Sequence, residues 1–238
     1  MSVKNPFPFD HWPQQSPIKL FTADALFVDF PADHLRIDYS GAPYQGAFEG
    51  ESGHKNFVLD ANLSSGQSPP ILTLGRVKAR LVKIHLHTPS EHDLEGKDHD
   101  GEVHLIHQIE NPTTGSELIV LGVFFAKSTA KKSAKAGAEL TEFFETWTAG
   151  VKAAKRLGKS SGGPVAIDPN LLLPGLDKWF QYEGSLTSEP YNEFVTWVVF
   201  PTPLGITSDG LKKLKAEAHQ PERPTQDINR RYVLRNFR

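Results

Sequence analysis

The chain of 238 residues contains no cysteine, so disulfide bonds and thiolate metal ligands are both excluded. It has no apolar run of about 18 residues, which argues against a membrane-spanning helix. Its formal net charge is only −2, which provides no electrostatic attraction to nucleic acid or to an anionic membrane. We therefore expect neither nucleic acid nor a membrane as a partner.

The N-terminal residues also lack the apolar stretch of a signal peptide. Together with the absence of cysteine, which is compatible with a reducing compartment, this predicts a soluble, cytoplasmic protein. Hydrophobic residues make up 38% and charged residues 23%, as in ordinary globular proteins. A chain of this length can form one domain, and we predict a single domain over residues 1–238. Its oligomeric state is not defined by the sequence.

Much of the chain has the pattern of β-strands, which predicts a mainly β fold of the α+β class. Residues 137–157 are the exception, because large apolar residues recur there at helical spacing and predict a helix packed on a sheet. These residues are Leu140, Phe143, Phe144, Trp147 and Val151. The expected strands are 56–60, 70–75, 79–87, 102–109, 118–125 and 192–200.

Four histidines lie on two of these strands, and three of them are expected to share one face. His85 and His87 are two residues apart and share one face, whereas Val82, Ile84 and Leu86 should point to the other. His104 lies in an alternating run that we expect to be the antiparallel return of the first strand. A His-x-His pair alone is common by accident, but a third histidine beside it favours a metal. Three neutral imidazoles with an open fourth position are typical of a catalytic zinc site.

The neighbouring polar residues have simpler interpretations. Glu102 shares a face with His104, so it is either a solvated strand residue or a carboxylate that fixes the tautomer of a histidine. His107 points to the opposite face from His104, which indicates a structural role. His99 stands between two aspartates and is expected at a solvated turn tip.

The motifs around these histidines resemble those of the α-class carbonic anhydrases. The resemblance runs in order from about residue 11 to about residue 231, which is nearly the whole chain. It implies a single domain with a large twisted, mainly antiparallel central sheet, a few peripheral helices, and an active site in a conical cleft. The matching segments are 15–18, 53–54, 83–87, 90–92, 102–107, 118–124, 182–188, 195–197 and 223–226.

The resemblance also implies a reaction, the reversible hydration of carbon dioxide to bicarbonate and a proton by zinc-bound hydroxide. Its cofactor would be Zn²⁺, held by His85, His87 and His104. Zinc lowers the pKa of bound water to about 7, which makes hydroxide available at neutral pH. The partner would be a small-molecule substrate.

Further residues take roles from the same resemblance. Thr187 would accept a hydrogen bond from the hydroxide and donate its own proton to Glu91, and His54 would carry protons to buffer. Glu102 would support His104, while His92 and Tyr182 would hold the Glu91 loop. The residues that would receive the substrate are Ile106, Val120, Leu186, Thr187, Ser188, Val195 and Trp197.

Some residues depart from the pattern of the family. Lys83 replaces the usual glutamine, Glu189 stands where a proline is common, and Asn56 and Phe57 differ from the common polar pattern just after the shuttle histidine. Strand alternation puts Lys83 on the face of His85, so it should line the cleft. It either approaches the metal or extends to solvent at the cleft mouth.

Two other functions fit parts of the sequence. His85-x-His87 followed by Glu91 and His104 imitates the metal box of a cupin-type dioxygenase, although the glycine and proline residues of that box are missing. A non-catalytic or repurposed member of the carbonic anhydrase fold, for example an esterase, is the second alternative, because fold alone does not fix a substrate.

Overall fold

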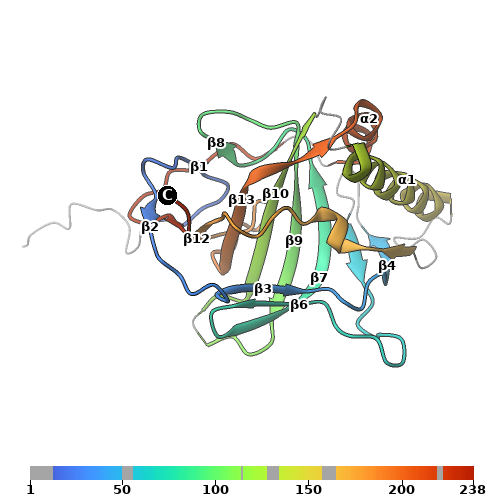
Figure 1. The fold of residues 1–238 in the computed structure, drawn as a ribbon, viewed down its shortest axis with the longest axis horizontal. Coiled ribbons are helices and arrows are strands. Elements are labelled where there is room, and N and C mark those ends of the chain that lie inside the picture. Colours follow the sequence, from blue (N-terminus) through green and yellow to red (C-terminus); the bar gives the residue numbers. More distant parts are fainter. Residues whose placement is uncertain (1–12, 50–55, 114, 128–133, 157–164, 219–221) are drawn as a thin grey trace, which may run out of the picture.

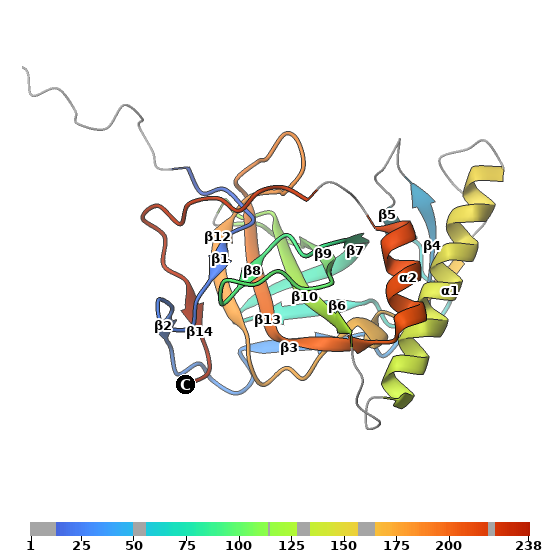
Figure 2. The same ribbon diagram turned by 90° about the horizontal axis from the view of Figure 1, so that it is seen from above.

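The computed structural model describes residues 13–49, 56–113, 115–127, 134–156, 165–218 and 222–238. Figure 1 shows a large twisted sheet, with the long strands β7, β9 and β10 at its centre. Helices α1 (Ala134–Arg156) and α2 (Ser208–Glu217) lie side by side at one end of the molecule (Figure 2). None of the helices in the described ranges is long and apolar enough to cross a membrane.

The central sheet has the order β11-β4-β5-β7-β9-β10-β13-β12-β14-β2, and β6 joins β3 to one end of β7. Neighbouring strands are antiparallel except in the pairs β10–β13 and β14–β2. The sheet is therefore mixed but mainly antiparallel, and the predicted fold class is confirmed. Its strands are β2 (Leu26–Phe27), β3 (Leu35–Asp38), β4 (Tyr44–Glu49), β5 (Asn56–Leu59), β6 (Ile71–Leu74), β7 (Val77–His87), β9 (Gly101–Ile109), β10 (Leu118–Lys127), β11 (Val165–Ile167), β12 (Phe180–Gly184), β13 (Val195–Ile206) and β14 (Leu234–Arg235).

Other short elements lie outside this sheet. Strands β1 (Lys19–Leu20) and β8 (Asp93–Leu94) form a parallel pair, and a 3₁₀ turn covers Pro169–Leu172. The six predicted strands correspond to β5, β6, β7, β9, β10 and β13, and the predicted helix begins three residues earlier than expected. Helix α2 and the shorter strands were not predicted.

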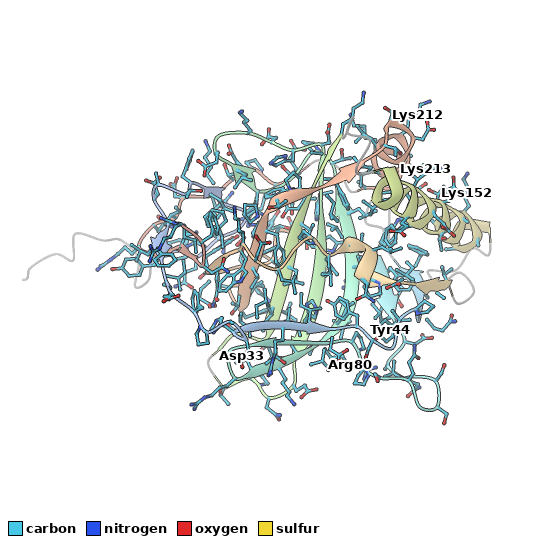
Figure 3. All side chains as sticks on the ribbon, in the orientation of Figure 1. Asp33, Tyr44, Arg80, Lys152, Lys212 and Lys213 are labelled. Atoms are coloured by element: carbon cyan, nitrogen blue, oxygen red, sulfur yellow. The ribbon has the colours of Figure 1, made fainter. Side chains whose placement is uncertain are left out.

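The sheet separates two apolar clusters. The larger one includes the predicted apolar face of α1, which packs on strand residues such as Ile84, Leu86 and Leu105. Figure 3 shows Lys152 of α1 and Lys212 and Lys213 of α2 on the outer side of the helices, away from this core. The smaller cluster includes Ile106, Val120, Val195 and Trp197.

One predicted orientation in β7 is wrong. Val82 was expected to point away from the histidines, but it packs against the smaller cluster, which contains Ile106. The cause is a bulge: Leu81 pairs with His107 and Lys83 pairs with Ile106, so Val82 is an additional residue in the strand. Ile84 and Leu86 do point into the helix-side core, as predicted.

Candidate active site

Strands β7 and β9 bring the three predicted ligands together. They pair antiparallel with His85 directly opposite His104, and His87 opposite Glu102. His87 and His104 are buried, and His85 is half-buried. Each histidine offers one ring nitrogen, and the three nitrogens all lie within 4.8 Å of one another. Nε2 of His85 and Nδ1 of His104 are 3.0 Å apart.

These distances fit a tetrahedral metal. Two nitrogens bound to one zinc ion at about 2.05 Å are separated by about 3.3 Å. Because Nε2 of His104 lies 3.1 Å from Oε1 of Glu102, its Nδ1 is the atom left to bind a metal. A set of neutral imidazoles without thiolate suits zinc among the common biological metals.

The Glu102 carboxylate organises the residues behind the three histidines. Its Oε2 accepts hydrogen bonds from the backbone N–H groups of Glu91 at 3.0 Å and His92 at 2.9 Å. Its Oε1 lies 2.7 Å from Nδ1 of His92 as well as 3.1 Å from Nε2 of His104. Burial favours the neutral acid, but His92 and His104 hold the pKa of Glu102 well below its usual value. An ionised Glu102 therefore fixes the ring orientation of His104.

A second histidine extends this network away from the metal site. Nε2 of His92 lies 2.7 Å from the hydroxyl of Tyr182, and that hydroxyl is 3.0 Å from Oγ of Ser16. All three side chains are buried. The chain from Ser16 through Tyr182, His92 and Glu102 thus ends at His104. Ser16 lies in a segment that the sequence comparison had matched, but its contact with Tyr182 was not predicted.

Glu91 also lies close to two of these histidines. Its Oε2 lies 3.4 Å from Nε2 of His87 and 3.8 Å from Nδ1 of His104. Its Oε1 accepts a hydrogen bond from the backbone N–H of Arg223 at 3.2 Å. Burial raises the pKa of Glu91, while His104, the Thr187 side chain and the Arg223 amide act in the opposite direction. The Thr187 side chain and the Glu91 carboxylate are therefore close enough to interact.

An apolar wall lies beside the histidines. Ile106, Val120, Val195 and Trp197 are buried in one cluster, against which half-buried Leu186 packs. The Trp197 ring meets the His104 ring edge-on, with centroids 4.8 Å apart. Ser188, by contrast, is exposed at the end of the same loop. The wall is thus assembled from β9, β10 and β13, three adjacent strands.

The remaining predicted positions differ in their outcome. Half-buried Lys83 is on the same face as His85, and Asn56 of β5 pairs with His85 itself. His54 lies outside the described residues. The prediction for His99 is wrong: it is half-buried, its ring centroid lies 4.7 Å from that of Phe124, and burial lowers its pKa.

His107 belongs to the core, as predicted. The Tyr39 hydroxyl lies 2.6 Å from its Nε2, and its Nδ1 donates a hydrogen bond to the carbonyl oxygen of Ile119 at 3.1 Å. Because this ring is fully buried, its pKa is lowered to about 4. A neutral His107 is consistent with both contacts.

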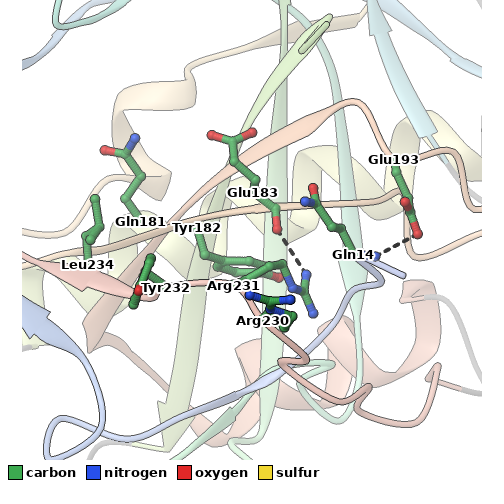
Figure 4. Close-up of a pocket in the computed structure, with 9 residues that line it drawn as sticks. All are labelled: Gln14, Gln181, Tyr182, Glu183, Glu193, Arg230, Arg231, Tyr232 and Leu234. Atoms are coloured by element: carbon green, nitrogen blue, oxygen red, sulfur yellow. Dashed lines mark hydrogen bonds between the residues drawn. The ribbon is translucent and has the colours of Figure 1, made fainter. Parts of the chain in front are cut away.

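A large pocket elsewhere does not contain the histidine cluster. It has a volume of about 730 Å³ and shares only Tyr182 with the network described above (Figure 4). Arg231 is one of the residues that line it, and its guanidinium carbon lies 5.6 Å from the centre of the Tyr182 ring. This size is common for ligand sites, but none of the three candidate metal ligands is among the described residues that line it.

The fold and the three histidines define an α+β protein with a candidate metal centre on one face of a mixed sheet. Residues 4–238 match the family model of the eukaryotic-type carbonic anhydrases, and the chain belongs to this family, whose members are lyases that hydrate carbon dioxide. The resemblance predicted from the motifs is therefore confirmed, and the cupin alternative is wrong.

Individual relatives support this assignment. The chain is 28% identical to a carbonic anhydrase of a Nostoc species, over 93% of this chain and 75% of the relative. It is 26% identical to human carbonic anhydrase 3, over 96% and 95% of the two chains. The solved α-carbonic anhydrase of Photobacterium profundum superimposes with a TM-score of 0.67 at 25% identity, over 93% and 88%.

Proposed function

We propose that this chain catalyses the reversible hydration of carbon dioxide, with zinc as its cofactor. The observation that carries the proposal is the set of three imidazole nitrogens within 4.8 Å, from His85, His87 and His104. A zinc ion bound there would supply the Lewis acidity that makes hydroxide available at neutral pH. Glu102 contributes by holding His104 in the tautomer that leaves Nδ1 free for a metal.

The apolar wall suits the proposed substrate. Carbon dioxide is small, apolar and uncharged, so its site needs an apolar surface close to the nucleophile rather than an anion-binding loop. In this proposal the surface is formed by the cluster around Val120, Val195 and Trp197. Leu186, Ile106 and exposed Ser188 would complete it.

Thr187 and Glu91 would orient the nucleophile. An ionised Glu91 can only accept hydrogen bonds, so the Thr187 hydroxyl must give it its proton. The Thr187 oxygen is then an acceptor, and only a nucleophile that carries a proton can bond to it in this way. The pair would thus favour hydroxide and aim its lone pair at the carbon of the substrate.

Each turnover also releases a proton, which must leave the site. We assign this step to His54, because the unperturbed pKa of histidine is close to neutrality. Replacing His54 with alanine should lower kcat in weak buffer and leave kcat/KM nearly unchanged, and added imidazole should restore kcat. An unchanged kcat would remove His54 from the mechanism.

A single domain and a cytoplasmic location stay predictions.

Removal and return of the metal test the function. The protein treated with a chelator should lose carbon dioxide hydration, and zinc should restore it in proportion to the metal bound. His104→Ala should bind little zinc, whereas His99→Ala should behave as the parent, since His99 packs on Phe124. Full hydration activity without bound metal would contradict the proposal. Zinc binding without activity would favour the non-catalytic alternative.

A further inference from the structure

Tyr191 has an unusual backbone for a bulky residue. Its φ angle is 59°, in the left-handed region that glycine and asparagine adopt far more easily. It closes the loop that follows Thr187, and its N–H donates a hydrogen bond to the carbonyl oxygen of Ser188 at 2.9 Å. A conformation of this kind has an energetic cost and persists only where surrounding contacts hold it.

Those contacts come from Arg223. The guanidinium carbon of Arg223 lies 3.7 Å from the centre of the Tyr191 ring, which is a close cation–π arrangement. The guanidinium is itself fixed, since Nη1 donates to the carbonyl oxygen of Ser16 at 2.6 Å and Nη2 to Oε1 of Gln15 at 2.8 Å. Nε2 of Gln15 then donates to the carbonyl oxygen of Tyr191 at 3.2 Å, which closes a ring of three residues.

Arg223 also contacts Glu91 of the candidate site. The backbone N–H of Arg223 donates to Oε1 of Glu91, while its side chain holds Tyr191. Thr187 lies four residues before Tyr191 on the loop, and its hydroxyl lowers the pKa of Glu91. One residue of the C-terminal segment thus contacts both Glu91 and the loop that carries Thr187.

We propose that Tyr191 is a positioning residue for this pair. Stacked on Arg223, it sets the distance between the Thr187 loop and the Glu91 carboxylate. The planar guanidinium on a planar ring restrains the loop more than an aliphatic contact does. The inference rests on the proposed function, because positioning matters only if Thr187 and Glu91 act on a nucleophile.

Two substitutions at one position separate the ring from its hydroxyl. Tyr191→Phe keeps a ring face for Arg223 and should hydrate carbon dioxide within about twofold of the parent. Tyr191→Leu keeps an apolar side chain without that face, and kcat/KM should fall about tenfold, the size expected for one partly desolvated cation–π contact. Zinc content should be equal in all three proteins, since the contacts that Tyr191 makes in the described part of the chain are with Ser188, Gln15 and Arg223.

A second readout does not require activity. In the metal-free protein, amide hydrogen exchange at residues 186–192 and at Arg223 should be faster in Tyr191→Leu than in Tyr191→Phe. Arg223→Lys keeps the backbone amide to Glu91 but loses the planar stack together with the guanidinium hydrogen bonds to Ser16 and Gln15, so its exchange should be at least as fast as in the Leu variant. It also serves as the test if Tyr191→Leu does not fold.

The outcomes distinguish this inference from the function itself. An active parent whose Tyr191→Leu and Arg223→Lys variants keep parental kcat/KM would overturn the role of Tyr191 and leave the function intact. Equal exchange in all variants would also overturn it. An inactive parent with bound zinc would contradict the proposed function and, with it, the positioning role.

Discussion

A Cβ atom placed on Gly122 would lie only 2.7 Å from Oε1 of Glu102. Gly122 is the residue of β10 that pairs with His104. The missing side chain therefore leaves the space in which the Glu102 carboxylate reaches both His92 and His104. Glycine is therefore required at this position because a side chain would not fit, and not because of its conformational freedom.

Gly122→Ala should consequently displace Glu102 and weaken metal binding. Loss of a carboxylate that orients a ligand typically costs about 10- to 100-fold in metal affinity, and we expect a loss in that range. Competition with a chromophoric chelator measures it. Gly150→Ala is the matched control, because its Cβ would meet the Phe48 ring at 2.3 Å, and Phe48 belongs to the helix-side core. It should lower stability and leave zinc affinity unchanged. Equal affinities in Gly122→Ala and the parent would show that the carboxylate can shift without consequence.

Thr187→Ala should keep the metal and lose activity. Removing one oriented hydrogen-bonding group from a transition state costs about 10²-fold in rate, so kcat/KM for carbon dioxide should fall by that factor. Thr187→Ser retains the hydroxyl and should recover much of the loss. Stopped-flow hydration assays on proteins of equal zinc content make the comparison. A rate for Thr187→Ala that matches the parent would remove the Thr187–Glu91 pair from the mechanism.

His107 should make the stability of the metal-free protein depend on pH. Burial lowers its pKa from the ordinary 6.5 to about 4 in the folded protein, so the unfolded chain binds the proton first as the pH falls. The contribution of His107 to the free energy of unfolding is therefore fully present above about pH 6.5. It decreases toward pH 4, by about 1.4 kcal/mol per pH unit. Urea unfolding of the parent and of His107→Gln at several pH values isolates this contribution. A difference between the two proteins that does not change with pH would contradict it.

Lys83 should strengthen the binding of anions at the candidate metal site. It shares the face of His85 and is half-buried, so its positive charge is only partly screened. A charge at roughly 8 Å with an effective dielectric near 20 contributes about 2 kcal/mol at most. Lys83→Gln should weaken inhibition by simple anions severalfold at low salt. It should also shift the pH at which kcat/KM increases to a higher value. Lys83→Arg should retain both properties. Profiles of Lys83→Gln that overlay the parent would show that the lysine is fully solvated.

The strands at the centre of the sheet could be predicted because their side chains alternate. That alternation also paired β7 with β9 and placed His104 beside His85. It failed at Val82, where one additional residue reverses the direction of the side chain and no local pattern reveals the bulge.

Contacts between segments that are distant in the chain could not be predicted from the sequence. Arg223 reaches Glu91 across 132 positions of the chain, and the motif around Arg223 showed only that the segment was similar to the family. His99 was misjudged for a related reason, since its neighbours in sequence are acidic while its neighbour in space is Phe124. Such contacts follow from tertiary packing, which single-sequence patterns do not contain.

The central claim is that the three histidines hold a zinc ion that serves carbon dioxide hydration. Metal content and hydration rate, measured on the same purified sample, test it most directly. The account predicts one zinc per chain and a hydration rate that disappears with the metal in His87→Ala. A protein that binds no zinc, or that hydrates carbon dioxide equally well in His87→Ala, would contradict it.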